Sequence, residues 1–99
     1  MERKAVFKVP NGKLLKVTAD IDDTVLVSVQ ITGDFFVYPE ESIIQLEQLL
    51  RYHPLEKDLL LYMIDGFFKQ NNVELFGVTA EAICDAIMQC SMQSGDKHV

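Results

Sequence analysis

The feature that most constrains the fold of this chain is a change of hydrophobic period near Pro39. Before it, apolar and polar residues alternate with a period of two, the pattern of half-buried strands; after it, apolar residues recur every three or four positions, as in amphipathic helices. Strands followed by helices predict an α+β fold, an antiparallel sheet with helices packed on one face. The 99 residues are expected to form one domain, with a β-meander at 1–38, a helical part at 39–92 and a flexible tail at 93–99.

The strand-like half of the chain contains two turn signals. Asn11-Gly12 is the pair that a tight type I′ hairpin favours, because both of its positions need positive φ, and Asp22-Asp23 marks a second turn. The segments on either side of the turns predict three antiparallel strands in a meander. The side chains expected to face the core alternate along these strands and are Ala5, Phe7, Val9, Leu15, Val17, Ala19, Ile21, Val25, Val27, Val29 and Ile31.

The first helix is expected to begin at Pro39, whose fixed φ suits a first helical position. Glu40 and Glu41 would then lie in the first turn, where the helix dipole favours negative charge. His53-Pro54 is expected to end the helix, because proline cannot continue it. The expected buried stripe consists of Ile43, Leu46, Leu49 and Leu50.

Two more helices are expected after the first. The segment from Leu55 to about Gln70 is apolar nearly all round, which predicts the central and most buried helix of the domain. Val73–Phe76 is expected to be a short extended piece. Thr79 is the expected N-cap of a last helix that runs to about Met92.

Charge and hydropathy exclude several classes of partner. The formal net charge of −6 comes without a cluster of Lys or Arg in the sequence, so nucleic acid and anionic membranes are not expected partners. The longest apolar run, Leu59 to Ile64, is far shorter than the roughly 20 residues that cross a bilayer. Residues 1–4 lead directly into a strand pattern without a targeting segment, so the expected location is cytoplasmic.

The residues that carry chemistry form no recognisable catalytic or metal-binding set. There is no Gly-rich phosphate loop, no pair of histidines with metal spacing and no nucleophile in a known setting, so the chain is not expected to catalyse a reaction alone. Cys84 and Cys90, on one helix, would point about 120° apart, and they are expected to be small buried thiols. His53 and His98 are expected to be surface or capping residues.

One irregular segment joins the last expected strand to the first expected helix. Gly33 permits positive φ or the close approach of another backbone, Asp34 offers a charged acceptor, and Phe35, Phe36 and Tyr38 offer flat apolar surface. Two interpretations are open. In one, the segment is a strand exit in which the acid binds local amides and the aromatic rings join the core. In the other, the segment is a site that a second protein contacts.

Three motifs occur in order within the first half of the chain, between Val6 and Arg51. They are Val9-Pro10-Asn11-Gly12-Lys13-Leu14, Ile31-Thr32-Gly33-Asp34-Phe35-Phe36 and Pro39-Glu40-Glu41, with alternating strands between the first two. Together they resemble the C-terminal accessory domain of lipoate-protein ligases, and Thr-Gly-Asp-Phe-Phe is the specific part. Asn11 departs from the Gly-Gly-Lys turn typical of that family, but it suits a hairpin equally well.

The resemblance implies a function that needs a second chain. In that family a large domain joins ATP and lipoate into lipoyl-adenylate and transfers the lipoyl group to a lysine of an acceptor domain. This chain would be the separate accessory subunit of a two-chain, archaeal-type ligase, in a heterodimer with the catalytic subunit that it supports in adenylation. ATP, Mg and lipoate would bind at the catalytic subunit and not to this chain alone, and lipoyl-acceptor domains would be indirect partners. The resemblance also implies a fold similar to sulfur-acceptor and iron-sulfur scaffold proteins.

Six residues are candidates for this function. The partner interface is expected at Gly33, Asp34, Phe35, Phe36 and Tyr38. Asp34 is expected to accept hydrogen bonds from backbone or basic groups and so to hold the phenylalanines in a docking geometry. Lys13, projecting from the hairpin, is either a phosphate contact or a solvated surface lysine.

Two alternatives belong to other functional classes. The first is a sulfur-acceptor or iron-sulfur scaffold module, which needs an exposed thiolate or a cluster of ligands and which the helical, divergent positions of Cys84 and Cys90 oppose. The second is a structural dimerisation domain, indicated by Met88 and Met92 on the more polar side of the last helix.

Overall fold

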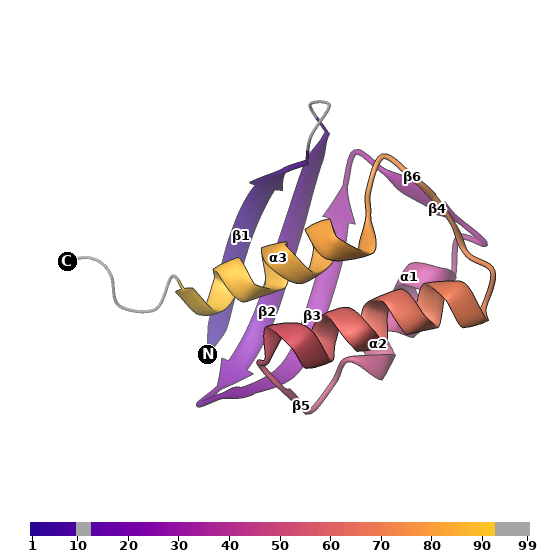
Figure 1. Cartoon of the computed structure of the whole chain (residues 1–99). Helices are drawn as coiled ribbons and strands as arrows, with labels where there is room; N and C mark the ends of the chain where they lie inside the picture. Colours follow the sequence, from indigo (N-terminus) through magenta and orange to yellow (C-terminus); the bar gives the residue numbers. More distant parts are fainter. Residues whose placement is uncertain (10–12, 93–99) are drawn as a thin grey trace.

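The computed structural model describes residues 1–9 and 13–92 of the chain, so the expected Asn11-Gly12 turn, the tail and His98 lie outside the described residues. It has an antiparallel sheet covered on one face by helices, which confirms the α+β class (Figure 1). The elements in chain order are β1 (Glu2–Lys8), β2 (Leu14–Asp22), β3 (Val25–Gly33), β4 (Phe36–Tyr38), α1 (Ser42–Leu49), β5 (His53–Pro54), α2 (Lys57–Gln70), β6 (Glu74–Phe76) and α3 (Ala80–Met92).

The main sheet has four strands in the order β1-β2-β3-β5, all antiparallel neighbours. The expected meander β1-β2-β3 is confirmed, but the expectation of three strands was one short. The extra strand arises where His53-Pro54, expected only to end a helix, pairs with Val25 and Leu26. Proline is tolerated there because β5 is an edge strand and its missing N–H costs no ladder hydrogen bond. His53 Nδ1 lies 2.8 Å from the carbonyl oxygen of Arg51, a contact within the turn between α1 and β5.

One expected core face was wrong at the start of β3. Leu26 is fully buried, whereas Val25 and Val27, expected in the core, are only half-buried. The pairing of β2 with β3 shifts register between Asp20 and Ile21, which is a β-bulge. Because a bulge adds one residue to one strand, it reverses which side chains face the core on the far side of it.

Helix α1 begins later than expected. The N–H of Ser42 donates to the carbonyl of Pro39 at 3.0 Å, so residues 39–41 form a turn and Glu41 is the N-cap. Leu46 and Leu50 are buried as expected, but Leu49 is exposed. The buried positions Ser42, Leu46 and Leu50 recur every four residues, and Leu49 lies at the edge of this stripe. Glu47 ties the helix to the sheet by accepting a hydrogen bond from the N–H of Ile31 at 2.7 Å.

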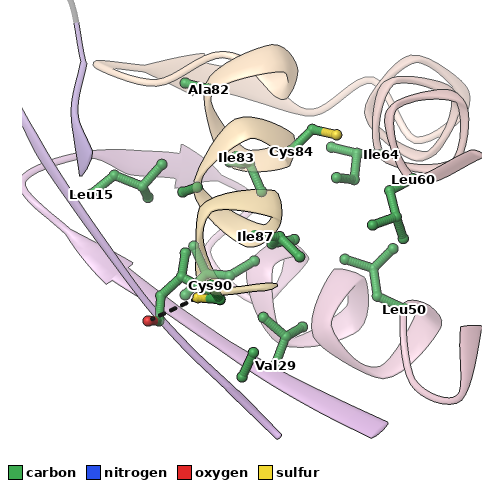
Figure 2. Packing of buried hydrophobic residues seen from close by; sticks show 14 of the residues in the cluster. Leu15, Val29, Leu50, Leu60, Ile64, Ala82, Ile83, Cys84, Ile87 and Cys90 are labelled. Atoms are coloured by element: carbon green, nitrogen blue, oxygen red, sulfur yellow. Dashed lines mark hydrogen bonds between the residues drawn. The ribbon is translucent and has the colours of Figure 1, made fainter. Parts of the chain in front are cut away.

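The most buried helix is α3, not α2 as expected. Figure 2 shows Ile83, Ile87 and Cys90 between the strands and the side chains of α2. Helix α3 is rich in Ala and Cys, which let its backbone approach both neighbours, whereas α2 carries large side chains outward, with Tyr62 78% exposed. The expected N-cap is confirmed, since the N–H of Ala82 donates to Thr79 Oγ1 at 3.0 Å. No helix within residues 1–9 and 13–92 is long and apolar enough to cross a membrane.

A second, two-stranded sheet lies beyond the end of β3 (Figure 1). The extended piece expected at Val73–Phe76 is β6, and it pairs with β4 in antiparallel register. The helical part, 39–92, therefore contains two short strands, of which β6 was expected as an extended piece and β5 was not. The pairing brings residues 36 to 40 positions apart in sequence to one surface, at the segment expected to contact a partner.

Candidate partner-docking site

Gly33 ends β3 where the backbone of β2 comes very close. A Cβ atom at Gly33, whose φ is +154°, would lie 2.3 Å from the carbonyl oxygen of Leu14. The same carbonyl accepts a hydrogen bond from the N–H of Asp34 at 2.9 Å. The close approach of another backbone that Gly33 permits is therefore to a strand of the same chain.

The side chain of Asp34 is exposed to solvent. Its carboxylate has no hydrogen-bond or ion-pair partner within the described part of the chain. It does not bind local amides there, although its own N–H is held by β2. A fixed backbone with a free carboxylate leaves Asp34 available as an acceptor for another molecule, and its role at an interface stays a prediction.

The three aromatic residues of the segment divide between core and surface. Phe35 is half-buried and packs against the core. Phe36 and Tyr38 are each 64% exposed, because side chains alternate along β4 and the intervening Val37 points inward. One ring therefore joins the core, as the strand-exit interpretation expected, and two rings face outward. Contact of the exposed rings with a second protein stays a prediction.

A fourth aromatic residue belongs to the same surface. Register places Phe76 of β6 opposite Phe36, and their rings are stacked with centroids 4.8 Å apart at an angle of 19°. Phe36, Tyr38 and Phe76 form what we call the aromatic ribbon, the outward face of β4 and β6. Sequence reasoning missed Phe76 because only the pairing of β4 with β6 makes it a neighbour.

The aromatic ribbon has an acidic border and a hollow beside it. The exposed acids Asp34, Glu40 and Glu41 flank it in sequence, and Glu74 lies opposite Tyr38 in the strand pairing. A hollow of about 310 Å³ lies between the ribbon and α1, with a mainly apolar lining. Its lining residues are Ile31, Thr32, Gly33, Phe35, Phe36, Val37, Glu40 and Ile43. Such a hollow can accept an apolar side chain of a partner while the acids remain in water.

Lys13 lies at a different hollow, of about 560 Å³, between the first hairpin and the start of α3. The lining is apolar at Phe7 and Val78, but it also includes the carboxylates of Glu81 and Asp85. Negative charge on both acids disfavours a phosphate in this hollow. The structure therefore favours the solvated-lysine interpretation of Lys13, and contact with a phosphate stays an untested prediction.

Both cysteines are buried on α3, as expected. The Cys84 thiol donates to the carbonyl of Lys57 at 3.4 Å and the Cys90 thiol donates to that of Val17 at 3.8 Å, the latter drawn in Figure 2. Burial raises the pKa of each thiol to about 11, so neither is a thiolate at neutral pH. The geometry therefore disfavours the sulfur-acceptor alternative. No group of three His, Cys, Asp or Glu residues could hold a metal ion among the residues described. Met88 packs partly against the core, which weakens the case for a methionine dimer surface.

A known sequence and a solved structure that the chain resembles both come from Thermoplasma acidophilum. No family model matches the chain. A 44-residue stretch is 46% identical to lipoate-protein ligase A subunit 2 of Thermoplasma acidophilum, covering 44% of this chain and 47% of that protein, so the match spans about half the length of the relative.

The structural match covers more of the chain. It is to a chain in the solved structures of an archaeal lipoylation system, a bi-partite lipoate protein ligase and its E2 lipoyl domain from the same organism. The TM-score is 0.76 with 34% sequence identity, over 88% of this chain and 94% of that chain. Identity of this size over nearly the full length of both chains shows common family as well as common fold, and the curated relative supplies the subunit. The chain belongs to the family of the second subunit of two-part lipoate-protein ligases.

Proposed function

We propose that this chain is the accessory subunit of a lipoate-protein ligase and acts only with a separate catalytic subunit. The observation that carries the proposal is the 34% identity over 94% of a chain from a bi-partite ligase system. The catalytic subunit binds ATP, Mg and lipoate and transfers the lipoyl group to a lysine of lipoyl-acceptor domains, while this chain contributes no catalytic group. The complex works in the cytoplasm, and the accessory fold is of the sulfur-acceptor and iron-sulfur scaffold type.

The aromatic ribbon is the surface that docks the catalytic subunit. Phe36, Tyr38 and Phe76 are large, exposed and held rigidly by the β4-β6 pairing, and aromatic side chains on a rigid support dominate the energy of many interfaces. The adjacent hollow supplies a pocket for a partner side chain, and Asp34 supplies a free acceptor at the border. The ribbon therefore combines an apolar centre with a charged border, the usual arrangement of a stable protein interface.

A docked accessory subunit helps adenylation without touching the reacting atoms. Attack of a carboxylate on a phosphate requires neutralised charge, and the acyl-adenylate formed must be kept from water. A domain that holds a loop of the catalytic subunit in place contributes both effects by positioning.

The test is a pyrophosphate-release assay with ATP, Mg and lipoate. It compares this chain alone, the catalytic subunit alone and an equimolar mixture. We expect release from the mixture at a rate well above the sum of the separate chains, and none from this chain alone. Robust release by this chain alone, or an unchanged rate on mixing at concentrations that form the complex, would contradict the proposal.

A further inference from the structure

The charges of this acidic chain are strongly segregated along the sequence. Residues 1–16 hold five of the nine Lys and Arg residues and only one acid, whereas residues 17–99 hold the other four and 14 of the 15 acids. The five basic residues are Arg3, Lys4, Lys8, Lys13 and Lys16. All of them belong to the β1-β2 hairpin or its immediate neighbourhood.

Strand register gathers three of these lysines on the sheet face opposite the helices. Lys16 of β2 lies directly beside Val6 of β1, and Lys4 and Lys8 flank Val6 on the same strand. We call this surface the lysine face. The expectation that the chain has no basic cluster is corrected here. The three lysines are four and eight residues apart in the sequence, and only the pairing of β1 with β2 makes them neighbours.

The lysine face is free of internal partners in the part of the chain that the structure describes. None of its three lysines forms an ion pair with a described residue. Asp20, at the opposite end of the same face, is already paired with the N-terminal amine at 2.8 Å. The helices pack on the other side of the sheet, so the lysine face is open to solvent (Figure 1).

The chemistry of the face fits an acidic protein surface better than a nucleic acid. Its centre is apolar, with Val6 62% exposed and Leu14 also exposed. No aromatic side chain of β1 or β2 can stack on a nucleic-acid base there, because Phe7 points inward. The rest of the molecule is strongly acidic and repels a phosphate backbone. A carboxylate-bearing protein surface with a small apolar spot complements the face in both respects.

We propose that the lysine face binds an acidic surface of the lipoyl-acceptor domain and presents it to the catalytic subunit, an inference that rests on the function proposed above. The catalytic subunit stays bound, and the aromatic ribbon suits such a partner because stable interfaces have apolar centres. An acceptor domain must arrive and leave in every turnover. Charge suits that exchange, since it raises the association rate and contributes little to lifetime.

The test reverses the charge of the face in the assembled two-chain enzyme. The Lys4→Glu/Lys8→Glu/Lys16→Glu variant is compared with an Arg51→Glu/Lys57→Glu/Lys69→Glu control, which makes the same change of net charge on the helical side of the fold. Far-UV circular dichroism and thermal unfolding check that both variants fold. Three quantities are measured: the KM for the acceptor domain in lipoyl transfer, the rate of pyrophosphate release without acceptor, and the Kd for the catalytic subunit.

We expect the lysine-face variant to raise the acceptor KM at least about tenfold, the lower end of electrostatic steering effects. The rate of pyrophosphate release and the Kd for the catalytic subunit should stay within about twofold of the parent, the range expected of surface substitutions outside an interface. The control variant should leave all three quantities near those of the parent. Raising the ionic strength should raise the acceptor KM of the parent, because salt screens attraction, and lower that of the lysine-face variant, because salt screens repulsion.

Several outcomes would overturn the inference while leaving the accessory function intact. An unchanged acceptor KM with normal pyrophosphate release is the simplest. A weakened Kd for the catalytic subunit would assign the face to that subunit instead. Self-association of the variant with a normal KM would mean that the lysines protect an edge strand from pairing. Loss of binding to a duplex DNA fragment, again with a normal KM, would indicate a phosphate backbone. If the parent pair released no pyrophosphate, the proposed function itself would fail.

Discussion

Phe36→Ala tests the aromatic ribbon most directly, because Phe36 is exposed in the free chain and central in the proposed interface. Burying a phenylalanine side chain completely is worth about 1.5–3 kcal/mol. Since 64% of Phe36 is exposed, roughly two thirds of that value remains for an interface to gain, about 1–2 kcal/mol. Phe36 also lines the hollow beside the ribbon, and truncating a residue at the centre of an interface commonly costs about 2 kcal/mol or more.

The substitution should lower the stability of the free chain by less than it lowers the binding free energy of the complex. Its main loss is the stacking on Phe76 at 4.8 Å, worth about 0.5–1.5 kcal/mol. The variant should therefore remain folded, with a slightly lower melting temperature. Its affinity for the catalytic subunit should fall about 30-fold, the equivalent of about 2 kcal/mol.

Isothermal titration calorimetry against the catalytic subunit measures the affinity, and thermal unfolding measures the stability. Tyr62→Ala is the matched control, since Tyr62 is an exposed aromatic residue on α2 outside the ribbon. Its affinity should stay within about threefold, as expected for a residue outside the interface. If Phe36→Ala and Tyr62→Ala bind equally well, the ribbon is not the docking surface.

Four further predictions follow from single features. Gly33→Ala should lower the free energy of unfolding by about 2–4 kcal/mol in a urea titration, because it strains the backbone and weakens the hydrogen bond from Asp34 N–H to the Leu14 carbonyl. A loss below about 0.5 kcal/mol would refute the strain argument. Asp34→Asn should reduce complex formation about tenfold or more if the carboxylate accepts a charge-assisted bond, with stability unchanged; equal adenylation at limiting subunit concentration would exclude this role. The complex should persist in about 0.5 M salt, roughly five times the ionic strength at which the Debye length is about 10 Å, and full dissociation would indicate a mainly electrostatic interface. Burial raises the pKa of the Cys84 and Cys90 thiols to about 11, above the unfolded value near 9.0, so their contribution to the free energy of unfolding is present below pH 9 and is lost as pH rises towards 11. A Cys84→Ala/Cys90→Ala variant should lack this part of the decline in stability. Rapid labelling of the native thiols at pH 8 would contradict their burial.

Local patterns in the sequence were sufficient for the class of fold. Alternation placed the core faces of β1 and β2 correctly, and the Thr79 cap and the change of period near Pro39 located the helical half. These features depend on neighbours within a few residues, so a linear pattern contains them. Part of the expected docking segment was also visible, because a glycine, an acid and three aromatic residues stand together in the sequence.

The tertiary structure decided the features that depend on which distant segments meet. The β-bulge reversed the core face at the start of β3, β5 added a fourth strand, and the small side chains of α3 made it the central helix. Phe76 joined Phe36, and Lys16 joined Lys4 and Lys8, only through strand pairing. The hydrophobic pattern of a strand indicates which of its faces is buried, but it does not indicate which strand lies beside it. Strand pairing and register are set by the packing of the whole core. Both proposed binding surfaces are products of register, and for that reason neither could be read completely from the sequence.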